Sequence, residues 1–283
     1  MRSLLAIPVL LGLAHAAAAQ SLPPETRAAV APDGKQVQLT TTFGKRSTTQ
    51  LQIGKAKPVT VHTGEAAGGL AAGHDKLIVA LATDAKTDPF KIVVVTGDKR
   101  GQAITVARPG TRRDHPFAVA ATATSDGFTV FFQEVQADDP SAAHTYLLKL
   151  DSDGKPDGEA KEVAVPWSLA AAVDNGAGYH LALIYPGDGM RISMVSLTPD
   201  GAPEQHPDWA SPPGFITQVQ LVREDKTIRA FYKGGKNNDR IQEIDVTAIR
   251  NWGTEPPKAK DHGAIGARQA LAIANGKPVK ISR

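Results

Sequence analysis

Residues 146–167, YLLKLDSDGKPDGEAKEVAVPW, are the part of the sequence most informative about the fold. It contains two runs in which apolar and polar residues alternate, separated by turn-forming residues, and it ends in a tryptophan. Alternation with a period of two is typical of a β-strand that buries one face. The Asp-Gly steps between the runs favour a tight turn because these residues tolerate positive φ. The stretch therefore predicts an antiparallel hairpin.

Comparable strands recur along the chain at a regular spacing. β-rich runs begin at Gln36, Leu77, Phe128, Tyr179, Thr227 and Lys277, so successive starts are 41, 51, 51, 48 and 50 residues apart. Each run follows a strand of small residues that ends in a turn, and most are followed by a polar loop and further alternating strands. Four antiparallel strands that repeat at this spacing, with no amphipathic helix between them, are the signature of a β-propeller.

We therefore predict an all-β protein in which residues 20–283 form a single β-propeller of five or six four-stranded blades. The last unit, RQALAIANGKPVKISR, supplies only two strands. We expect these C-terminal strands to pair with N-terminal strands and close the ring, since closure removes exposed sheet edges. A pair of β-sandwiches is the alternative fold, because alternating strands with frequent turns also suit that architecture.

Residues 1–19 are predicted to be a secretory signal peptide. They begin with the positive charge of Arg2, continue with an apolar run and end in alanines ahead of Gln20. We expect a secreted or periplasmic protein without membrane insertion. The chain has no cysteine, so neither a disulfide nor a lipid-modified cysteine stabilises or anchors it. A formal net charge of +3 is too small to argue for nucleic acid, and we expect a monomer.

The repeat resembles that of secreted bacterial β-propeller proteins over nearly the whole mature chain. The chain has no Trp-Asp dipeptide at blade ends, no kelch-type double glycine in register and no strict Asp-box. No subfamily's functional residues can therefore be carried over, and a fold shared by many activities does not define this one.

In such a propeller, the connectors between blades and the loops between second and third strands lie on one face. All three tryptophans, Trp167, Trp209 and Trp252, fall in connectors. They could stack on a sugar ring or anchor a protein partner, with Arg113 beside them. Alternatively, each tryptophan fills the wedge between adjacent blades, and Arg113 is solvated. Our principal prediction is a binding or scaffolding module for a protein or polysaccharide, and not an enzyme.

A metal site is a second possibility on the same face. The connectors carry Asp114 with His115, His206 with Asp208, and Asp261 with His262. Imidazole and carboxylate ligands would suit zinc, whereas calcium would draw oxygen ligands from Asp138, Asp139 or Asp188. Ordinary turn chemistry explains the same residues without a metal. We therefore expect no cofactor, with a divalent cation, calcium or zinc, as the alternative.

The alternative function is a hydrolase or lyase on the rim, acting on a carbohydrate or lactone with or without a metal ion. Four segments predicted to be innermost, FAVAATAT, SLAAAV, FITQVQLV and QALAIA, contain no acid. An active site would need carboxylates from the rim, of which Glu134, Asp188 and Asp239 are the candidates. Glu134 ends a phenylalanine-rich strand, and burial there would raise its pKa as a general acid requires. The competing interpretation is a carboxylate that faces water.

Overall fold

The computed structural model describes residues 25–111, 114–136, 139, 142–166, 168–187, 189–204, 208–210, 215–247 and 258–282, with the backbone alone for 185–187, 189–190 and 208–210. All regular elements in these ranges are β-strands, as predicted. No helix in the described part of the chain is long and apolar enough to span a membrane.

The strands form five complete blades and one smaller sheet. Blade 1 contains β1 (Glu25–Val30), β2 (Gln36–Thr42), β3 (Thr48–Ile53) and β4 (Val59–Thr63). Blade 2 contains β5 (Ala66–Gly73), β6 (Lys76–Thr83) and β7 (Phe90–Thr96), with β8 (Lys99–Arg100) and β9 (Ile104–Val106) sharing its outer position. Blade 3 contains β10 (Asp114–Ala123), β11 (Gly127–Gln136), β12 (Ala143–Asp151) and β13 (Lys161–Val163).

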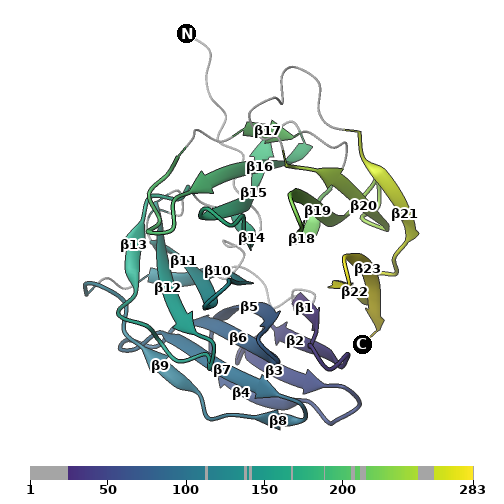
Figure 1. Ribbon diagram of the computed structural model, residues 1–283. Helices are drawn as coiled ribbons and strands as arrows, with labels where there is room; N and C mark the ends of the chain where they lie inside the picture. The colour runs from purple at the N-terminus through teal and green to yellow at the C-terminus, as the bar shows by residue number, and fades with distance from the viewer. Residues whose placement is uncertain are drawn as a thin grey trace.

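The remaining strands complete the ring. Blade 4 contains β14 (Leu169–Asp174), β15 (Tyr179–Gly187), β16 (Gly189–Leu197) and β17 (Asp208–Ala210). Blade 5 contains β18 (Thr217–Glu224), β19 (Thr227–Gly234), β20 (Arg240–Asp245) and β21 (Lys260–Ala264). The last sheet contains only β22 (Gln269–Ala274) and β23 (Lys277–Ser282). The six first strands surround the axis, and β22 and β23 stand between blades 5 and 1 (Figure 1).

Pairing of the C-terminal strands with N-terminal strands, the predicted mode of ring closure, is not seen among the described residues. Within the described residues, β22 and β23 hydrogen-bond as strands only to each other. Their sheet packs face to face on blade 1, where Ala28 meets Ala270, Ala272 and Ile281. The Gln38 side chain also donates to the backbone oxygen of Ser282 at 2.8 Å. Small side chains fit the narrow wedge between the two sheets, so packing joins the chain ends without a shared ladder.

The hairpin at residues 146–167 forms as predicted. Tyr146 of β12 lies opposite Glu162 of β13 in an antiparallel ladder, the outer pair of blade 3. The turn is closed by Asp151, whose carboxylate accepts from the backbone nitrogens of Asp153 and Lys155 at 2.9 Å each. Gly154 occupies this turn at φ 78°, where a Cβ would lie 2.6 Å from Ile78 of blade 2. Glycine is therefore required both by the turn and by the neighbouring blade.

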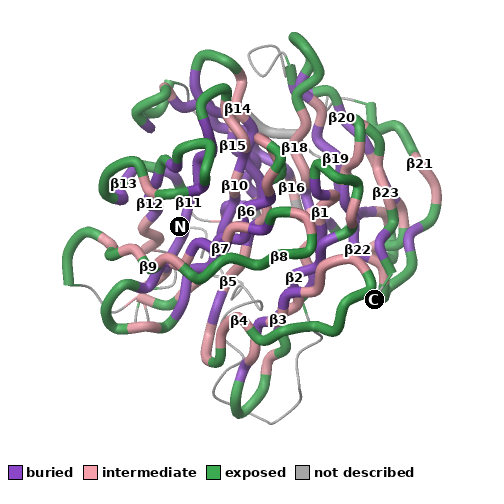
Figure 2. Tube along the Cα trace, turned by 60° about the horizontal axis from the view of Figure 1, so that its bottom comes forward, coloured by how far each residue is buried: buried purple, intermediate pink, exposed green. Residues whose placement is uncertain are grey.

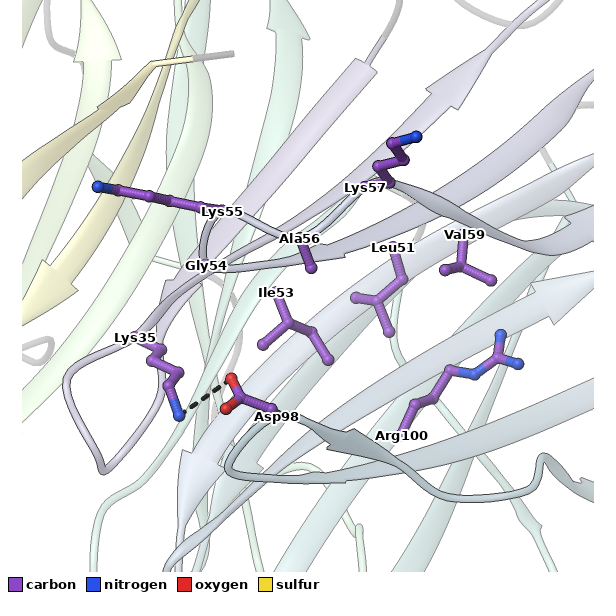
Figure 3. Close-up of a pocket in the computed structure, with 10 residues that line it drawn as sticks. All are labelled: Lys35, Leu51, Ile53, Gly54, Lys55, Ala56, Lys57, Val59, Asp98 and Arg100. Carbon is purple, nitrogen blue, oxygen red and sulfur yellow. Dashed lines mark ion pairs between the residues drawn. The ribbon is translucent and has the colours of Figure 1, made fainter.

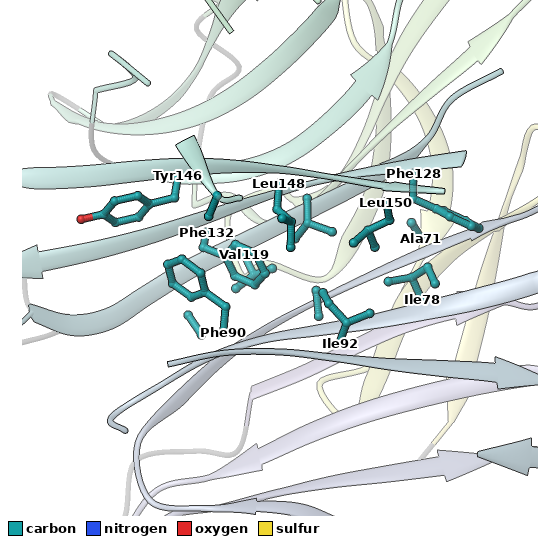
Figure 4. Close-up of a cluster of buried hydrophobic side chains, with 14 residues drawn as sticks. Ala71, Ile78, Phe90, Ile92, Val119, Phe128, Phe132, Tyr146, Leu148 and Leu150 are labelled. Atoms are coloured by element: carbon teal, nitrogen blue, oxygen red, sulfur yellow. The ribbon is translucent and has the colours of Figure 1, made fainter. Parts of the chain in front are cut away.

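The hydrophobic core lies in the wedges between neighbouring blades. Between blades 2 and 3, Phe90 and Phe132 stack with their ring centroids 4.1 Å apart, and Tyr146 tilts against Phe90 (Figure 4). Second strands such as β6 and β11 are almost wholly buried, whereas the outer strands β8 and β21 are mostly exposed (Figure 2). Second strands are buried because adjacent blades cover both of their faces.

Candidate functional site at the channel mouth

A narrow channel follows the axis of the propeller. Its cavity of about 210 Å³ is lined by small side chains of all six first strands, including Ala71, Ala121 and Ala171. The four segments predicted to be innermost do lie here, as β10, β14, β18 and β22. Among the described lining residues, Arg27 alone is charged. The described wall of the channel therefore offers no acid for catalysis.

We call the face that carries the blade connectors the upper face, and its opening into the channel the upper mouth. The first residue of β1, Glu25, lies at this mouth and forms an ion pair with Arg27 at 2.8 Å. The Glu25 side chain is 49% exposed. Glu25 is not among the predicted site residues, because the four segments predicted to be innermost do not include β1. The alternation of Glu25 and Arg27 in ETRAAV is the signal that could have found it.

A second carboxylate follows on the neighbouring blade. Glu65 precedes β5, and its Oε2 lies 2.9 Å from Nδ1 of His115, the second residue of β10. The Glu65 and His115 side chains are 40% and 52% exposed, respectively, so both are open to solvent. Nε2 of His115 has no partner in the described structure. The arrangement is a histidine held by a carboxylate, with its other ring nitrogen free to exchange a proton.

A hydrogen-bonded chain from blades 1 and 2 positions Glu65. Lys91 Nζ lies 3.0 Å from His62 Nδ1, and His62 Nε2 lies 3.0 Å from Asp84 Oδ1. An ammonium group has no lone pair, so Nδ1 accepts, and Nε2 carries the proton donated to Asp84. Asp84 Oδ2 in turn accepts from the backbone nitrogen of Glu65 at 3.1 Å. The connector that carries Glu65 is thereby tied to two blades.

Gly64 allows this connector to approach Asp84. Its φ is 125°, and a Cβ built on it would lie 2.6 Å from each carboxylate oxygen of Asp84. Any other residue would push away the acceptor that holds the Glu65 backbone. The glycine is thus part of the positioning of Glu65.

Glu134 lies behind the mouth in a buried ion pair, and the interpretation that it faces water is wrong. Its side chain is fully buried at the end of β11, and Arg108 donates to its Oε2 at 2.5 Å. Its Oε1 has no hydrogen-bond partner. Burial raises the pKa of the Glu134 carboxyl above its ordinary value and nearby Asp114 adds to the rise, whereas Arg108 acts in the opposite direction. The packing of blades 2 and 3 makes this carboxyl a weaker acid than an exposed one.

The structure brings only part of the predicted metal set into view. Asp114 and His115 are consecutive in β10, so their side chains point to opposite faces and do not converge on one ion. Of the other ligands, His206 lies outside the described residues, and Asp208 is in β17, where only the backbone is described. The described residues contain no group of three or more metal-ligating side chains. The metal site remains a prediction.

The structure does not describe the side chains of most other predicted site residues. Trp167, Trp252, Arg113, Asp138 and Asp188 lie outside the described residues, and Trp209 is in β17, where only the backbone is described. The tryptophan rim therefore stays a prediction.

The predicted residues of blade 5 are far along the ring from β10. His262 Nε2 lies 2.5 Å from Glu243 Oε2, and Arg240 binds Asp261 at 3.0 Å. The backbone oxygen of Asp239, a predicted rim carboxylate, accepts from the nitrogen of Ile265 at 2.7 Å. Local ion pairs and a connector contact account for these residues.

No protein-family model matches the chain, and no curated protein matches it. Solved structures do. An α-L-arabinanase of Penicillium chrysogenum complexed with arabinobiose superposes with a TM-score of 0.53 at 14% identity, covering 80% of this chain and 77% of its own. An α-L-arabinofuranosidase of Fusarium graminearum in complex with an iminosugar inhibitor superposes with a TM-score of 0.51 at 10% identity, covering 81% and 78%. At such identities the likeness establishes the fold, and the protein is a β-propeller.

These likenesses correct the principal functional prediction. The principal prediction was a non-enzymatic binding or scaffolding module, yet the similar structures are an α-L-arabinanase and an α-L-arabinofuranosidase. The comparisons therefore back the alternative prediction, a hydrolase or lyase acting on a carbohydrate, better than the non-enzymatic module. The principal prediction was based on the absence of acids from four first strands and did not consider Glu25 and Glu65, at or just before the start of other first strands.

Proposed function

We propose that this protein is a hydrolase that cleaves a glycosidic bond of a carbohydrate at the upper mouth of the channel. The observation that carries the proposal is the exposed pair of Glu65 and His115, joined at 2.9 Å across two neighbouring blades. Glycosidic cleavage needs one group that protonates the leaving oxygen and another that activates water. The mouth offers both kinds of group on first strands or directly before them.

The proposed roles follow from exposure and hydrogen bonding. His115, oriented by Glu65, gives a proton to the leaving oxygen as the bond from the anomeric carbon breaks. Glu25, held by Arg27 at 2.8 Å, takes a proton from the water whose oxygen bonds to that carbon. After the product leaves, Glu25 releases to solvent the proton that it took from water, and His115 takes up one proton from solvent, so both groups regain their starting protonation. Glu134 has no exposed surface and is paired with Arg108, so it takes no direct part in the proposed reaction.

The test is hydrolysis of a panel that contains 4-nitrophenyl α-L-arabinofuranoside, 4-nitrophenyl β-xyloside, arabinan and arabinoxylan. We expect His115→Gln and Glu25→Gln each to lower kcat/KM by about 10²- to 10⁴-fold, the usual contribution of a positioned acid or base. Glu65→Gln should keep substrate binding and alter the pH profile, because Glu65 acts through His115. Glu159→Gln is the matched control, since Glu159 is exposed in a turn at the lower end of blade 3.

Two outcomes would reject the assignment. Wild-type protein that hydrolyses nothing in the panel would remove the proposed activity. Hydrolysis that survives both His115→Gln and Glu25→Gln at wild-type rate would place the active site elsewhere on the propeller.

The proposal also includes export, a monomeric state and the option of a metal ion. Export is supported by the pattern of residues 1–19 and is checked by whether the mature chain begins at Gln20. Gel filtration checks the monomer. Calcium or zinc at Asp114 or His115 would raise the melting temperature of chelated protein when the ion is added back, since a ligand that binds only the folded state stabilises it.

A further inference from the structure

A groove opens on the lower face of the propeller, away from the channel mouth. It lies between the β3–β4 hairpin of blade 1 and the outer edge of blade 2, and its volume is about 570 Å³. Small-molecule sites typically occupy roughly 300 to 1,000 Å³. Leu51, Ile53 and Val59 face into the groove from the hairpin, and Arg100 lies across from them (Figure 3).

The groove exists because the outer strand of blade 2 is interrupted. In place of one continuous fourth strand, β8 contributes two residues and β9 three, with residues 101–103 between them. The apolar side of the β3–β4 hairpin is consequently uncovered at Val59, whereas Leu51 is buried in the core and Ile53 packs against that core. Val59 is 47% exposed, one of only two large hydrophobic residues in the described chain with this degree of exposure. An exposed apolar wall inside a concave site costs free energy unless something covers it.

The charges around this apolar wall are mostly positive. Lys35, Lys55, Lys57 and Arg100 line the groove against a single carboxylate, Asp98. Lys35 is paired with Asp98 at 3.1 Å. No ion pair or hydrogen bond to a described residue engages the side chains of Lys55, Lys57 and Arg100. Arg100 is therefore free to bind an anion, and its planar guanidinium matches a carboxylate with two parallel hydrogen bonds.

We infer that this groove binds a single-chain amphiphile with a carboxylate head, a fatty carboxylate. The alkyl chain covers Val59 and the part of Ile53 that faces the groove, and the head group pairs with Arg100, with Lys55 and Lys57 adding positive potential. The described lining contains no aromatic side chain on which a sugar ring or a base would stack. The site is independent of the channel mouth, so it stands or falls separately from the proposed hydrolysis.

The experiment is titration calorimetry of the mature protein with sodium dodecanoate below its micelle concentration. We expect saturable binding at one site and much weaker binding of 1-dodecanol, which has the same chain without the charge. Arg100→Gln should weaken dodecanoate binding by about ten- to a hundredfold, the range for a hydrogen bond to a charged group. Val59→Asp should abolish it, because a carboxylate would then face the alkyl chain.

Lys45→Gln is the matched control, since Lys45 is an exposed cation on the opposite end of blade 1. It should bind dodecanoate as the wild type does. If Arg100→Gln and Val59→Asp both bound dodecanoate as tightly as the wild type, the inference would be overturned. So would association only with vesicles that contain phosphatidylglycerol, which would make the groove a membrane-contact surface. Circular dichroism of each variant shows whether it is folded, and a conservative Arg100→Lys that regains affinity distinguishes lost charge from lost structure.

Discussion

The junction between blades 2 and 3 differs sharply from the junction that closes the ring. Between blades 2 and 3, aromatic and large aliphatic side chains from several strands of each sheet fill the wedge, with Phe90 stacked on Phe132. Between blade 1 and the two-stranded sheet, the buried cluster contains only three alanines and Ile281. Both junctions are packed, but the first buries far more apolar surface.

The other side of the closing sheet shows how the protein covers a blade that lacks a full neighbour. Phe231 of blade 5 packs on Leu271 of β22. Arg229 lies 5.5 Å from the ring of Phe231, and His262 lies 5.6 Å from it. Glu243, directly opposite Phe231 in the ladder, hydrogen-bonds to both of these basic residues. Where outer strands are missing, a polar network covers the apolar surface.

The same network has an electrostatic signature. Burial alone would raise the pKa of Glu243, but hydrogen bonds from His262 and Arg229 hold that pKa below its ordinary value. At the other junction, burial raises the pKa of Glu134 despite its bond to Arg108. Full burial between two blades therefore disfavours the charged form of Glu134. At the partly covered junction, hydrogen bonds from His262 and Arg229 stabilise the charged form of Glu243.

We expect the largest loss of stability from a substitution at the junction between blades 2 and 3, where Phe90 stacks on Phe132. Phe132→Ala should lower the free energy of unfolding by about 3 to 5 kcal/mol, because it removes a fully buried ring and leaves a cavity beside Phe90. Urea denaturation measures the change. Phe215→Ala is the control, since Phe215 is 48% exposed and should cost less than 1 kcal/mol. A loss of similar size in both variants would mean that the wedge does not dominate stability.

We expect a smaller loss of stability from a substitution in the two-stranded sheet of β22 and β23. Leu271→Ala removes a buried side chain that meets Phe231 and Ile265, and it should cost about 2 kcal/mol, the low end for this substitution, because few large residues surround it. The same denaturation series measures it. A cost equal to that of Phe132→Ala would contradict the contrast between the two junctions.

The smallest effect is a change in pH dependence at Glu134. A carboxyl whose pKa is raised in the folded state binds its proton more tightly there than in the unfolded chain. Its contribution to stability is therefore complete below a pH of about 4.5 and is lost as the pH rises through the raised pKa. We expect Glu134→Gln to flatten this decline in unfolding free energies measured between pH 4 and 8. The decline should persist in Glu159→Gln, and an unchanged slope in Glu134→Gln would contradict the assignment.

Most of the fold was predictable because each blade repeats a local pattern. The alternation in β12 and the Asp-Gly turn after it identify a hairpin without reference to the rest of the chain. The repeated small-residue strands were placed correctly around the axis for the same reason. The mode of closure was not predictable, since the same two strands could pair with β1 or stack on it, and only the wedge geometry distinguishes the two.

The candidate site was predictable only in part. The sequence indicated His115 as a candidate metal ligand and Glu134 as a candidate general acid. It did not connect His115 with Glu65, which lies 50 residues away in sequence and 2.9 Å away in space. Nor did it show that Glu134 is fully buried, because its exposure depends on how blade 3 packs against Arg108 and blade 2.

The all-β class, the blade repeat, the turns and the absence of acids from four of the first strands follow from the order of residues alone. Those properties depend on alternation and turn chemistry within about 50 residues, a range over which local patterns act. The tertiary structure decided the closure of the ring, the union of Glu65 with His115, the burial of Glu134 and the groove beside Val59. Each of these arises where two blades meet, and contacts between blades follow from the packing of whole sheets, which no local pattern records.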